Sequence, residues 1–227
     1  MKYKVIFFDA DDTLFDFKKT QDFALDKLMD SIETEFDKDY CITEYKKVNT
    51  KIWEEFEQGL ISSSDLKVER FRRFAYNLGI TYDANELSSM YVDFLGDGSF
   101  LYEETYEILS YLSDKYKISI ITNGLADVQN RRIKKSTVSN FFDDVVISDE
   151  IKIAKPDPKI FEHALSNLNH TDKSSVLMIG DSLNSDIKGG INAGIDTCWF
   201  NLGKKINDSD FVPNYEINNL LELKDLL

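Results

Sequence analysis

The sequence predicts an α/β protein in which a parallel sheet, covered by helices on both faces, is interrupted by an inserted helical domain. After Tyr102, short apolar runs alternate with amphipathic helical segments, an order typical of a parallel sheet. One more apolar, β-prone run, Tyr3 to Phe8, stands near the N-terminus and reads as a strand buried on both faces. The 227 residues suffice for one large domain or for a medium domain with a smaller companion.

The segment between this first strand and Tyr102 has the pattern of helices alone. From about residue 18 to residue 101, apolar side chains recur at spacings of three and four, as they do on one face of an amphipathic helix. Ser62, followed three residues later by Asp65, indicates a helix start, and Gly59 and Gly79 indicate helix ends. The first crossover of the sheet therefore carries a helical insertion.

The second part of the chain supplies the other expected elements. They are, in order, helix 103–115, strand 117–122, helix 126–135, strand 144–148, helix 158–168, strand 175–180, helix 184–193 and strand 195–200. We therefore expect residues 1–15 and 102–227 to form the sheet domain and residues 16–101 to form the helical domain.

Composition limits the partners. Lys and Arg number 27 and Asp and Glu 41, and the net charge of −14 disfavours nucleic acid and anionic lipid. No apolar run approaches the roughly 20 residues of a membrane helix, and no signal peptide precedes the acidic Asp9, so we expect a cytoplasmic protein with no nucleic-acid or membrane partner. The local basic groups are interpreted as solvated helix faces; they are Arg70, Arg72, Arg73, Arg131, Arg132, Lys134 and Lys135.

Cysteine and histidine offer no catalytic or metal-binding pattern. Cys41 and Cys198 are isolated, which favours a packing role for both. His163 and His170 have no second histidine or cysteine at the spacing of a zinc site. The chemistry must therefore rest on other groups.

Acidic and hydroxyl side chains follow the expected strands where each strand ends. In an open α/β sheet, ligands bind at the carboxyl ends of the strands. The segments found there are Asp9-Ala10-Asp11-Asp12-Thr13, Thr122-Asn123-Gly124, Lys155-Pro156-Asp157-Pro158 and Gly180-Asp181-Ser182 with Asp186. Taken singly, each could be a turn or a helix cap. Four such segments at one edge of a sheet favour a functional site.

Carboxylates that gather at one edge repel one another and need a cation. Oxygen ligands without His or Cys select Mg²⁺ over zinc, and Asp9 and Asp181 are the expected carboxylate ligands. A count of Asp9, Asp11, Asp181 and Asp186 against Mg²⁺ and Lys155 leaves one negative charge. We assign a proton on Asp11 to balance it.

This set of groups matches a two-step phosphoryl transfer. A carboxylate such as Asp9 can attack phosphorus and form an aspartyl-phosphate. Asp11, which alternation along an extended strand points the same way, can protonate the leaving oxygen and later deprotonate water. Thr122, at a strand end before a helix, and Lys155 offer donors and positive charge to phosphoryl oxygens. The prediction is a Mg²⁺-dependent phosphohydrolase.

These four segments resemble the motifs of the haloacid dehalogenase (HAD) superfamily, and the helical insertion resembles its type-one cap on a Rossmann-like core. The resemblance implies that Asp9 is the nucleophile and Asp11 the general acid and base. It also implies that the Asp9 and Asp181 side chains and the backbone carbonyl of Asp11 bind Mg²⁺. It further implies that Thr122 and Lys155 hold the phosphoryl group and that Asp186 orients Lys155 or a water on the metal. Asn123, which follows Thr122 in the same motif, is a further candidate to bind substrate.

A finer resemblance concerns the substrate. Asp12, where many members have Gly, and the run Gly189-Gly190-Ile191-Asn192-Ala193-Gly194 are similar to the bacterial pyrimidine 5'-nucleotidase subgroup. This implies a small phosphorylated partner, a nucleoside monophosphate. Trp53 and Phe56 of the helical insertion are candidates to stack on its base.

Other functions stay open at this point. The enzymatic alternatives are a sugar-phosphate or phosphoglycolate phosphatase and a β-phosphoglucomutase-like mutase. A receiver-type phosphoacceptor domain also combines acids, a Thr and a Lys around Mg²⁺, but such domains have only about 120 residues and no such insertion. We expect a monomer or a weak homodimer.

Overall fold

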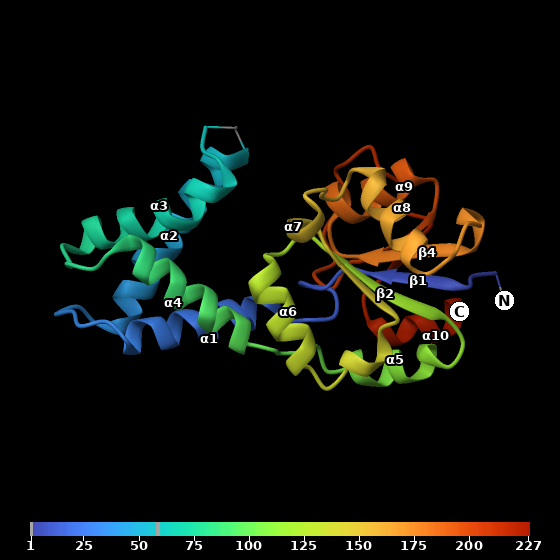
Figure 1. Ribbon diagram of the computed structural model, residues 1–227, viewed down its shortest axis with the longest axis horizontal. Helices are drawn as coiled ribbons and strands as arrows, with labels where there is room; N and C mark the ends of the chain where they lie inside the picture. The colour runs from blue at the N-terminus through green and yellow to red at the C-terminus, as the bar shows by residue number, and fades with distance from the viewer. Residues whose placement is uncertain (1, 58–59) are drawn as a thin grey trace. The chain divides into compact units, whose positions relative to one another are not determined.

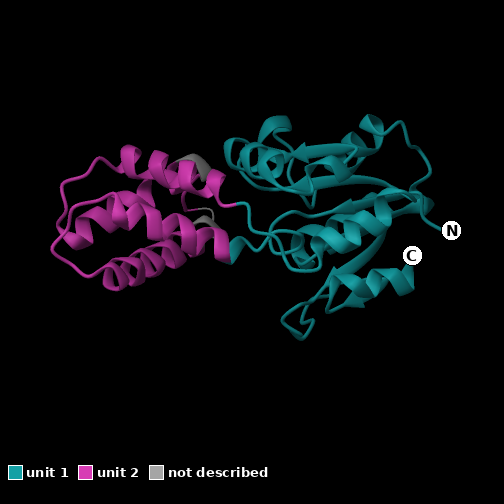
Figure 2. Ribbon diagram, turned by 90° about the horizontal axis from the view of Figure 1, so that it is seen from below, with its two compact units in different colours: residues 1–18, 99–227 teal, residues 19–98 magenta. Residues whose placement is uncertain are grey.

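The computed structural model describes residues 2–57 and 60–227. The chain divides into two compact units, one of residues 1–18 with 99–227 and one of residues 19–98 (Figure 2). We call them the α/β unit and the helical unit. The sequence analysis placed the junctions between residues 15 and 16 and between residues 101 and 102, whereas the structure has them between residues 18 and 19 and between residues 98 and 99.

The α/β unit is built on a six-stranded sheet with the order β3-β2-β1-β4-β5-β6, and every pairing in it is parallel (Figure 1). The strands are β1 (Val5–Phe8), β2 (Lys117–Thr122), β3 (Asp144–Ile147), β4 (Val176–Gly180), β5 (Asp196–Phe200) and β6 (Tyr215–Ile217). This confirms the predicted fold class. Strand β1 lies inside the sheet between β2 and β4, as its fully buried apolar sequence indicates.

Two apolar cores cover the two faces of this sheet. Val5 and Phe7 of β1 pack with α8 (Pro158–Asn167) and α9 (Lys188–Ala193). Ile6 and Phe8 face the opposite side, where α5 (Thr105–Ser113), α6 (Ala126–Lys135) and α10 (Leu223–Leu226) contribute core residues. Alternate side chains of each strand thus enter different cores.

Several short elements differ from the sequence-based expectation. β6 was not predicted, because its three residues at the sheet edge carry too little apolar pattern. The helix expected over 184–193 is divided into a π-helical turn at Leu183–Ile187 and α9. The remaining short elements are α7 (Ser148–Ile151) and three 3₁₀ turns, Ser139–Phe141, Lys173–Ser175 and Leu220–Glu222.

The helical unit contains most of α1 (Phe17–Asp30) and all of α2 (Lys38–Glu57), α3 (Ser63–Leu78) and α4 (Ala84–Asp97). Ser62 caps the start of α3 by accepting the Asp65 N–H, as predicted. Gly79 ends α3 with φ 65°, a left-handed conformation that favours glycine. The predicted helix end at Gly59 lies outside the described residues.

Burial overturns one expectation about charge. Arg132 has no exposed surface and Arg70 is only 6% exposed, so neither lies on a solvated helix face. Each sits among aromatic rings that cover the guanidinium, which helical periodicity in the sequence did not indicate. Both cysteines are buried, which fits the packing role expected for them. Among the described residues, none of the helices combines the length and apolar character needed to cross a bilayer.

Candidate functional site

The site forms where β1 and β4 end side by side. Phe8 of β1 pairs with Ile179 of β4, and the Asp9 N–H extends this ladder by donating to the Ile179 carbonyl at 2.9 Å. Asp9 and Asp181 therefore leave adjacent strands at the same edge of the sheet, as the sequence predicted.

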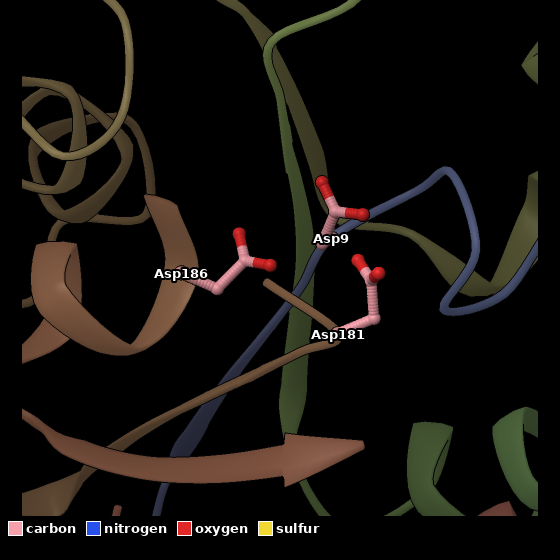
Figure 3. A group of neighbouring side chains, drawn as sticks. All are labelled: Asp9, Asp181 and Asp186. Carbon is pink, nitrogen blue, oxygen red and sulfur yellow. The ribbon is translucent and has the colours of Figure 1, made fainter. Parts of the chain in front are cut away.

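Three carboxylates meet at this edge. Ligand atoms of Asp9, Asp181 and Asp186 all lie within 4.8 Å of one another, and Figure 3 shows the three side chains gathered around one point. Asp9 and Asp186 are buried and Asp181 is half-buried. Such a set of oxygen donors could hold a hard divalent cation.

Lys155 is the buried cation of this cluster. Its Nζ donates to Asp9 Oδ1 at 2.5 Å and to the Ile121 carbonyl at 2.6 Å, and it lies 2.7 Å from Asp186 Oδ1. Burial acts to lower the pKa of Lys155, but the carboxylates of Asp186 and Asp9 outweigh it and raise that pKa. The lysine is therefore fully charged at neutral pH.

The charge of Lys155 does not balance the cluster. Burial raises the pKa of Asp9 well above its usual range, although the Lys155 charge opposes this, and burial together with Asp186 raises the pKa of Asp181 to about 7. Both shifts have the same physical cause, because negative charge is held away from water without enough positive charge nearby. A divalent cation would supply the missing positive charge, and the carboxylate oxygens are suitable ligands for it.

Glycine makes room for one member of the cluster. A Cβ added to Gly180 would lie 2.3 Å from Asp186 Cγ, so the carboxylate packs directly against the strand end. The same carboxylate accepts the Ser182 N–H at Oδ2, at 3.0 Å. The turn after β4 thus fixes Asp186 beside Lys155, the position that the sequence suggested.

Asn123 holds the loop that carries Lys155. Its Nδ2 donates to the Lys155 carbonyl at 3.0 Å, and its Oδ1 accepts the Lys155 N–H at 2.9 Å. Asp157 caps α8 by accepting the Lys159 N–H, and Pro158 begins the helix, as predicted. Since the Asn123 amide is engaged with this loop, contact between Asn123 and substrate stays a prediction.

Thr122 ends β2 at the same edge and is 1% exposed. Its Oγ1 accepts the Gly124 N–H at 3.1 Å, so the hydroxyl can still donate its own hydrogen. The residue thus offers one oriented donor, which suits a phosphoryl oxygen.

Asp11 has partners that the sequence did not indicate. Arg132 Nη1 donates to Asp11 Oδ1 at 2.5 Å, and Gln129 Nε2 donates to Oδ2 at 2.6 Å. The charge count that assigned a proton to Asp11 omitted Arg132, which had been interpreted as solvated. Arg132 adds one positive charge beside Asp11 that the count did not include, and the proton on Asp11 stays a prediction.

Two backbone features support these residues. Asp12 has φ 60°, a left-handed conformation that favours glycine, and its Oδ1 accepts the Phe17 N–H at 3.3 Å. Trp199 Nε1 donates to the Asp181 carbonyl at 2.8 Å and so fixes the turn that carries this ligand candidate.

The sequence did not indicate a role in the site for Gln129, Arg132 or Trp199. Gln129 and Arg132 are three residues apart on α6, on the face that also buries Val128 and Ile133. The sequence did contain a signal for Gln129 and Arg132, because both are polar residues on the apolar face of a predicted helix. Conversely, the side chains of Trp53 and Phe56 lie outside the described part of the chain, so base stacking stays a prediction.

The comparisons with known proteins agree with this geometry. Residues 3–194 match the family model of haloacid dehalogenase-like hydrolases. The chain is 34% identical to the pyrimidine 5'-nucleotidase YjjG of Escherichia coli, covering 100% of this chain and 99% of that protein. It is 33% identical to the pyrimidine 5'-nucleotidase PynA of Streptococcus pneumoniae, and this similarity covers 100% of this chain and 96% of that protein.

A solved structure is similar over the same length. The HAD-hydrolase YfnB of Bacillus subtilis, in a crystal form bound to magnesium, has a TM-score of 0.90 and 32% identity, covering 100% of this chain and 99% of that chain. The similarity therefore spans both units and is not confined to the sheet.

Proposed function

Since this chain belongs to the haloacid dehalogenase-like hydrolases, we propose that it is a Mg²⁺-dependent phosphatase that acts on pyrimidine nucleoside 5'-monophosphates through a phosphorylated Asp9. One observation carries the proposal: Asp9 lies within a cluster of three carboxylates and against a buried lysine, at the carboxyl ends of two adjacent strands. The carboxylates suit a metal, and the lysine suits a phosphoryl oxygen.

The metal site draws on oxygen atoms alone. Carboxylate oxygens of Asp9 and Asp181 and the backbone carbonyl of Asp11 would hold Mg²⁺. The ion would neutralise charge that develops on the phosphoryl oxygens. The raised pKa values of Asp9 and Asp181 support this assignment, because burial has left both carboxylates short of positive charge.

The reaction then has two steps. In the first, an Asp9 carboxylate oxygen bonds to phosphorus, the bond from phosphorus to the ester oxygen breaks, and Asp11 gives a proton to the departing nucleoside. In the second, water attacks phosphorus and gives a proton to Asp11. The bond from phosphorus to Asp9 breaks, releasing inorganic phosphate.

The other residues of the site hold the phosphoryl group. The Thr122 hydroxyl and Lys155 Nζ donate to its equatorial oxygens. Asp186 keeps Lys155 in place and would compensate its charge when Asp9 is phosphorylated. Asn123 fixes the backbone from which Lys155 projects.

The nucleotide preference is supported by the two nucleotidases to which the chain is similar over its full length. The acidic chain, with a net charge of −14, disfavours long polyanions, while the local cation site can still accept one phosphate group. On this proposal Trp53 and Phe56 would stack on the base.

Release of inorganic phosphate from a substrate panel tests the proposal. The panel holds UMP, dTMP, CMP, AMP, a hexose phosphate and phosphoglycolate, each with Mg²⁺ and with EDTA. We expect the highest kcat/KM for pyrimidine monophosphates and no release in EDTA. Preference for the hexose phosphate or phosphoglycolate would refute the nucleotidase assignment, and full activity in EDTA would refute the metal-dependent mechanism.

A further inference from the structure

Two side chains of α6 bind both carboxylate oxygens of Asp11, and we propose that Gln129 and Arg132 are positioning residues that hold this carboxylate for its proton transfers. The inference rests on the proposed phosphatase function. It adds two residues that act through Asp11 and do not themselves contact the reacting atoms.

The contacts leave the Asp11 side chain little freedom. Arg132 Nη1 is 2.5 Å from Oδ1 and Gln129 Nε2 is 2.6 Å from Oδ2, so the plane of the carboxylate is fixed from both ends. The Asp11 side chain keeps 24% of its surface exposed, while that of Arg132 is fully buried. The Asp11 carboxylate is therefore held by a buried side chain, while part of its own surface remains exposed to solvent.

The guanidinium of Arg132 is itself held in one plane. Its Cζ lies 5.2 Å from the centre of the Phe15 ring and 5.4 Å from that of Phe17. A lysine would keep the charge but would lack the planar guanidinium that lies against these two rings. A fully buried arginine is costly unless it is paired, which favours a specific task for this one.

The side chain of Gln129 is also oriented toward Asp11. Its Nε2 donates to Asp11, whereas its buried Oε1 has no hydrogen-bond partner within the described part of the chain. A Cβ on Gly124 would lie 2.2 Å from Gln129 Nε2, so only glycine leaves this path open. The amide thus reaches Asp11 although its own carbonyl oxygen stays unsatisfied.

The position of α6 in the chain links these contacts to the rest of the site. The helix begins at Ala126, just after Thr122-Asn123-Gly124, so one short segment carries the phosphoryl donor, the support for Lys155 and the two partners of Asp11. Gln129 and Arg132 contact the Asp11 side chain, whereas Asp9 is held by Lys155, so displacing the Asp11 side chain should leave the contact between Asp9 and Lys155 intact.

This separation makes the two reaction steps distinguishable. With p-nitrophenyl phosphate the leaving group departs without a proton, so Asp9 can become phosphorylated even when Asp11 is misplaced. Hydrolysis of the aspartyl-phosphate still needs Asp11 to accept a proton from water. A variant with a misplaced Asp11 should therefore accumulate the phosphorylated enzyme.

Rapid-mixing assays of p-nitrophenol release test this. With saturating p-nitrophenyl phosphate and Mg²⁺, Arg132→Met and Gln129→Leu should each show a burst close to one p-nitrophenol per enzyme. A steady rate about 10²-fold below that of the unmodified protein should follow. Asp11→Asn serves as the positive reference for the burst. Lys134→Met, which removes an exposed charge from the same helix, is the matched control and should show no burst.

Gln129→Asn and Arg132→Lys guard against a loss caused by misfolding alone. Both retain the polar group but shorten or reshape it, so each should give a burst while circular dichroism and the melting temperature stay near those of the unmodified protein. Unchanged turnover, or a proportional loss of both phases without a burst, would overturn the inference. If the unmodified protein releases no p-nitrophenol or nucleotide phosphate, the proposed function fails instead.

Discussion

The two units of the molecule both contain ion pairs, but the pairs of the candidate site are buried on the side of the cation, whereas the pairs of Lys38 in the helical unit are exposed. In the α/β unit, the side chains of Lys155 and Arg132 are 1% and 0% exposed against their carboxylates. In the helical unit, Lys38 pairs with Asp26 and Asp30, and these side chains are 35%, 53% and 56% exposed.

This difference reflects what each pair does. Buried charges lose hydration that their attraction seldom repays in full, so a buried pair is weak evidence for a stabilising role. Exposed pairs are screened by water and salt and contribute little. The helical unit is stabilised instead by apolar contacts, with the rings of Tyr45, Phe71 and Tyr91 packed 5.3 to 5.5 Å apart. In the α/β unit, the buried charges of Lys155 and Arg132 are both paired with carboxylates of the candidate site.

Asp9→Asn should have the largest effect, and on activity alone. The amide cannot act as the nucleophile, so we expect phosphate release to fall by about 10⁴-fold or more. The melting temperature should not fall, because the change removes a buried negative charge and Asp186 still pairs with Lys155. Phosphate release at the original rate would contradict the assignment of Asp9.

Lys155→Met tests the buried pair directly. It leaves Asp9 and Asp186 buried without their cation, and removing one partner of a buried pair costs about 3 to 5 kcal/mol. Urea unfolding measures this loss. Combining it with Asp9→Asn should recover part of the stability, and strictly additive losses would show that the two groups are not coupled.

Phe71→Ala tests the source of stability in the helical unit. Phe71 is fully buried and contacts two tyrosine rings, so the substitution should cost about 3 to 5 kcal/mol of unfolding free energy. Tyr76→Ala, on the same helix but 85% exposed, is the matched control. Equal losses in the two variants would contradict an aromatic core as the main support of this unit.

Mg²⁺ should stabilise the protein in a pH-dependent way. The pKa of Asp181 is raised to about 7, above the value of about 3.9 in an unfolded chain, so the folded state holds this proton more tightly. Without metal, stability should therefore fall as pH rises from about 4 to about 7. Mg²⁺ should cancel this fall, adding about 2.7 kcal/mol at a concentration 100-fold above its Kd.

Urea unfolding in EDTA and in Mg²⁺, at pH 5 and pH 8, measures that effect. Asp181→Asn is the control, because it should reduce the dependence in EDTA, to which Asp9 still contributes, and weaken the response to Mg²⁺. A larger stabilisation by Mg²⁺ at pH 5 than at pH 8 would run against the predicted sign.

Lys38→Met should have the smallest effect. Both of its ion pairs are exposed, so we expect a melting temperature within experimental error of the unmodified protein. A decrease comparable with that of Lys155→Met would break the contrast between the two units.

Elements defined by strong local signals were predictable. The strand Lys117–Thr122 and the helix Ala126–Lys135 have the predicted bounds, because an unbroken β-prone run and a helical pattern are separated by the polar turn around Gly124. The edge strand Tyr215–Ile217 was not predicted, since it forms only by pairing with β5, a contact distant in the chain.

The candidate site also contains residues that the sequence could identify and residues that it could not. Asp9, Thr122, Lys155 and Asp181 could be named because each follows an expected strand or precedes an expected helix, and parallel strands end at one edge. Gln129 and Arg132 could not, because glutamine and arginine side chains on a helix are ordinarily exposed.

The sequence by itself determined the fold class and the carboxylates, hydroxyl and lysine of the site, since alternating patterns and strand ends are local properties of the chain. Only the tertiary structure decided how the charges are shared. The burial of Arg132 against two rings, the hydrogen bond from Gln129 to Asp11, and the contact of Lys155 with two carboxylates each depend on residues far apart in the chain. Desolvation and pairing act through space, and they determine which of the acids need a cation.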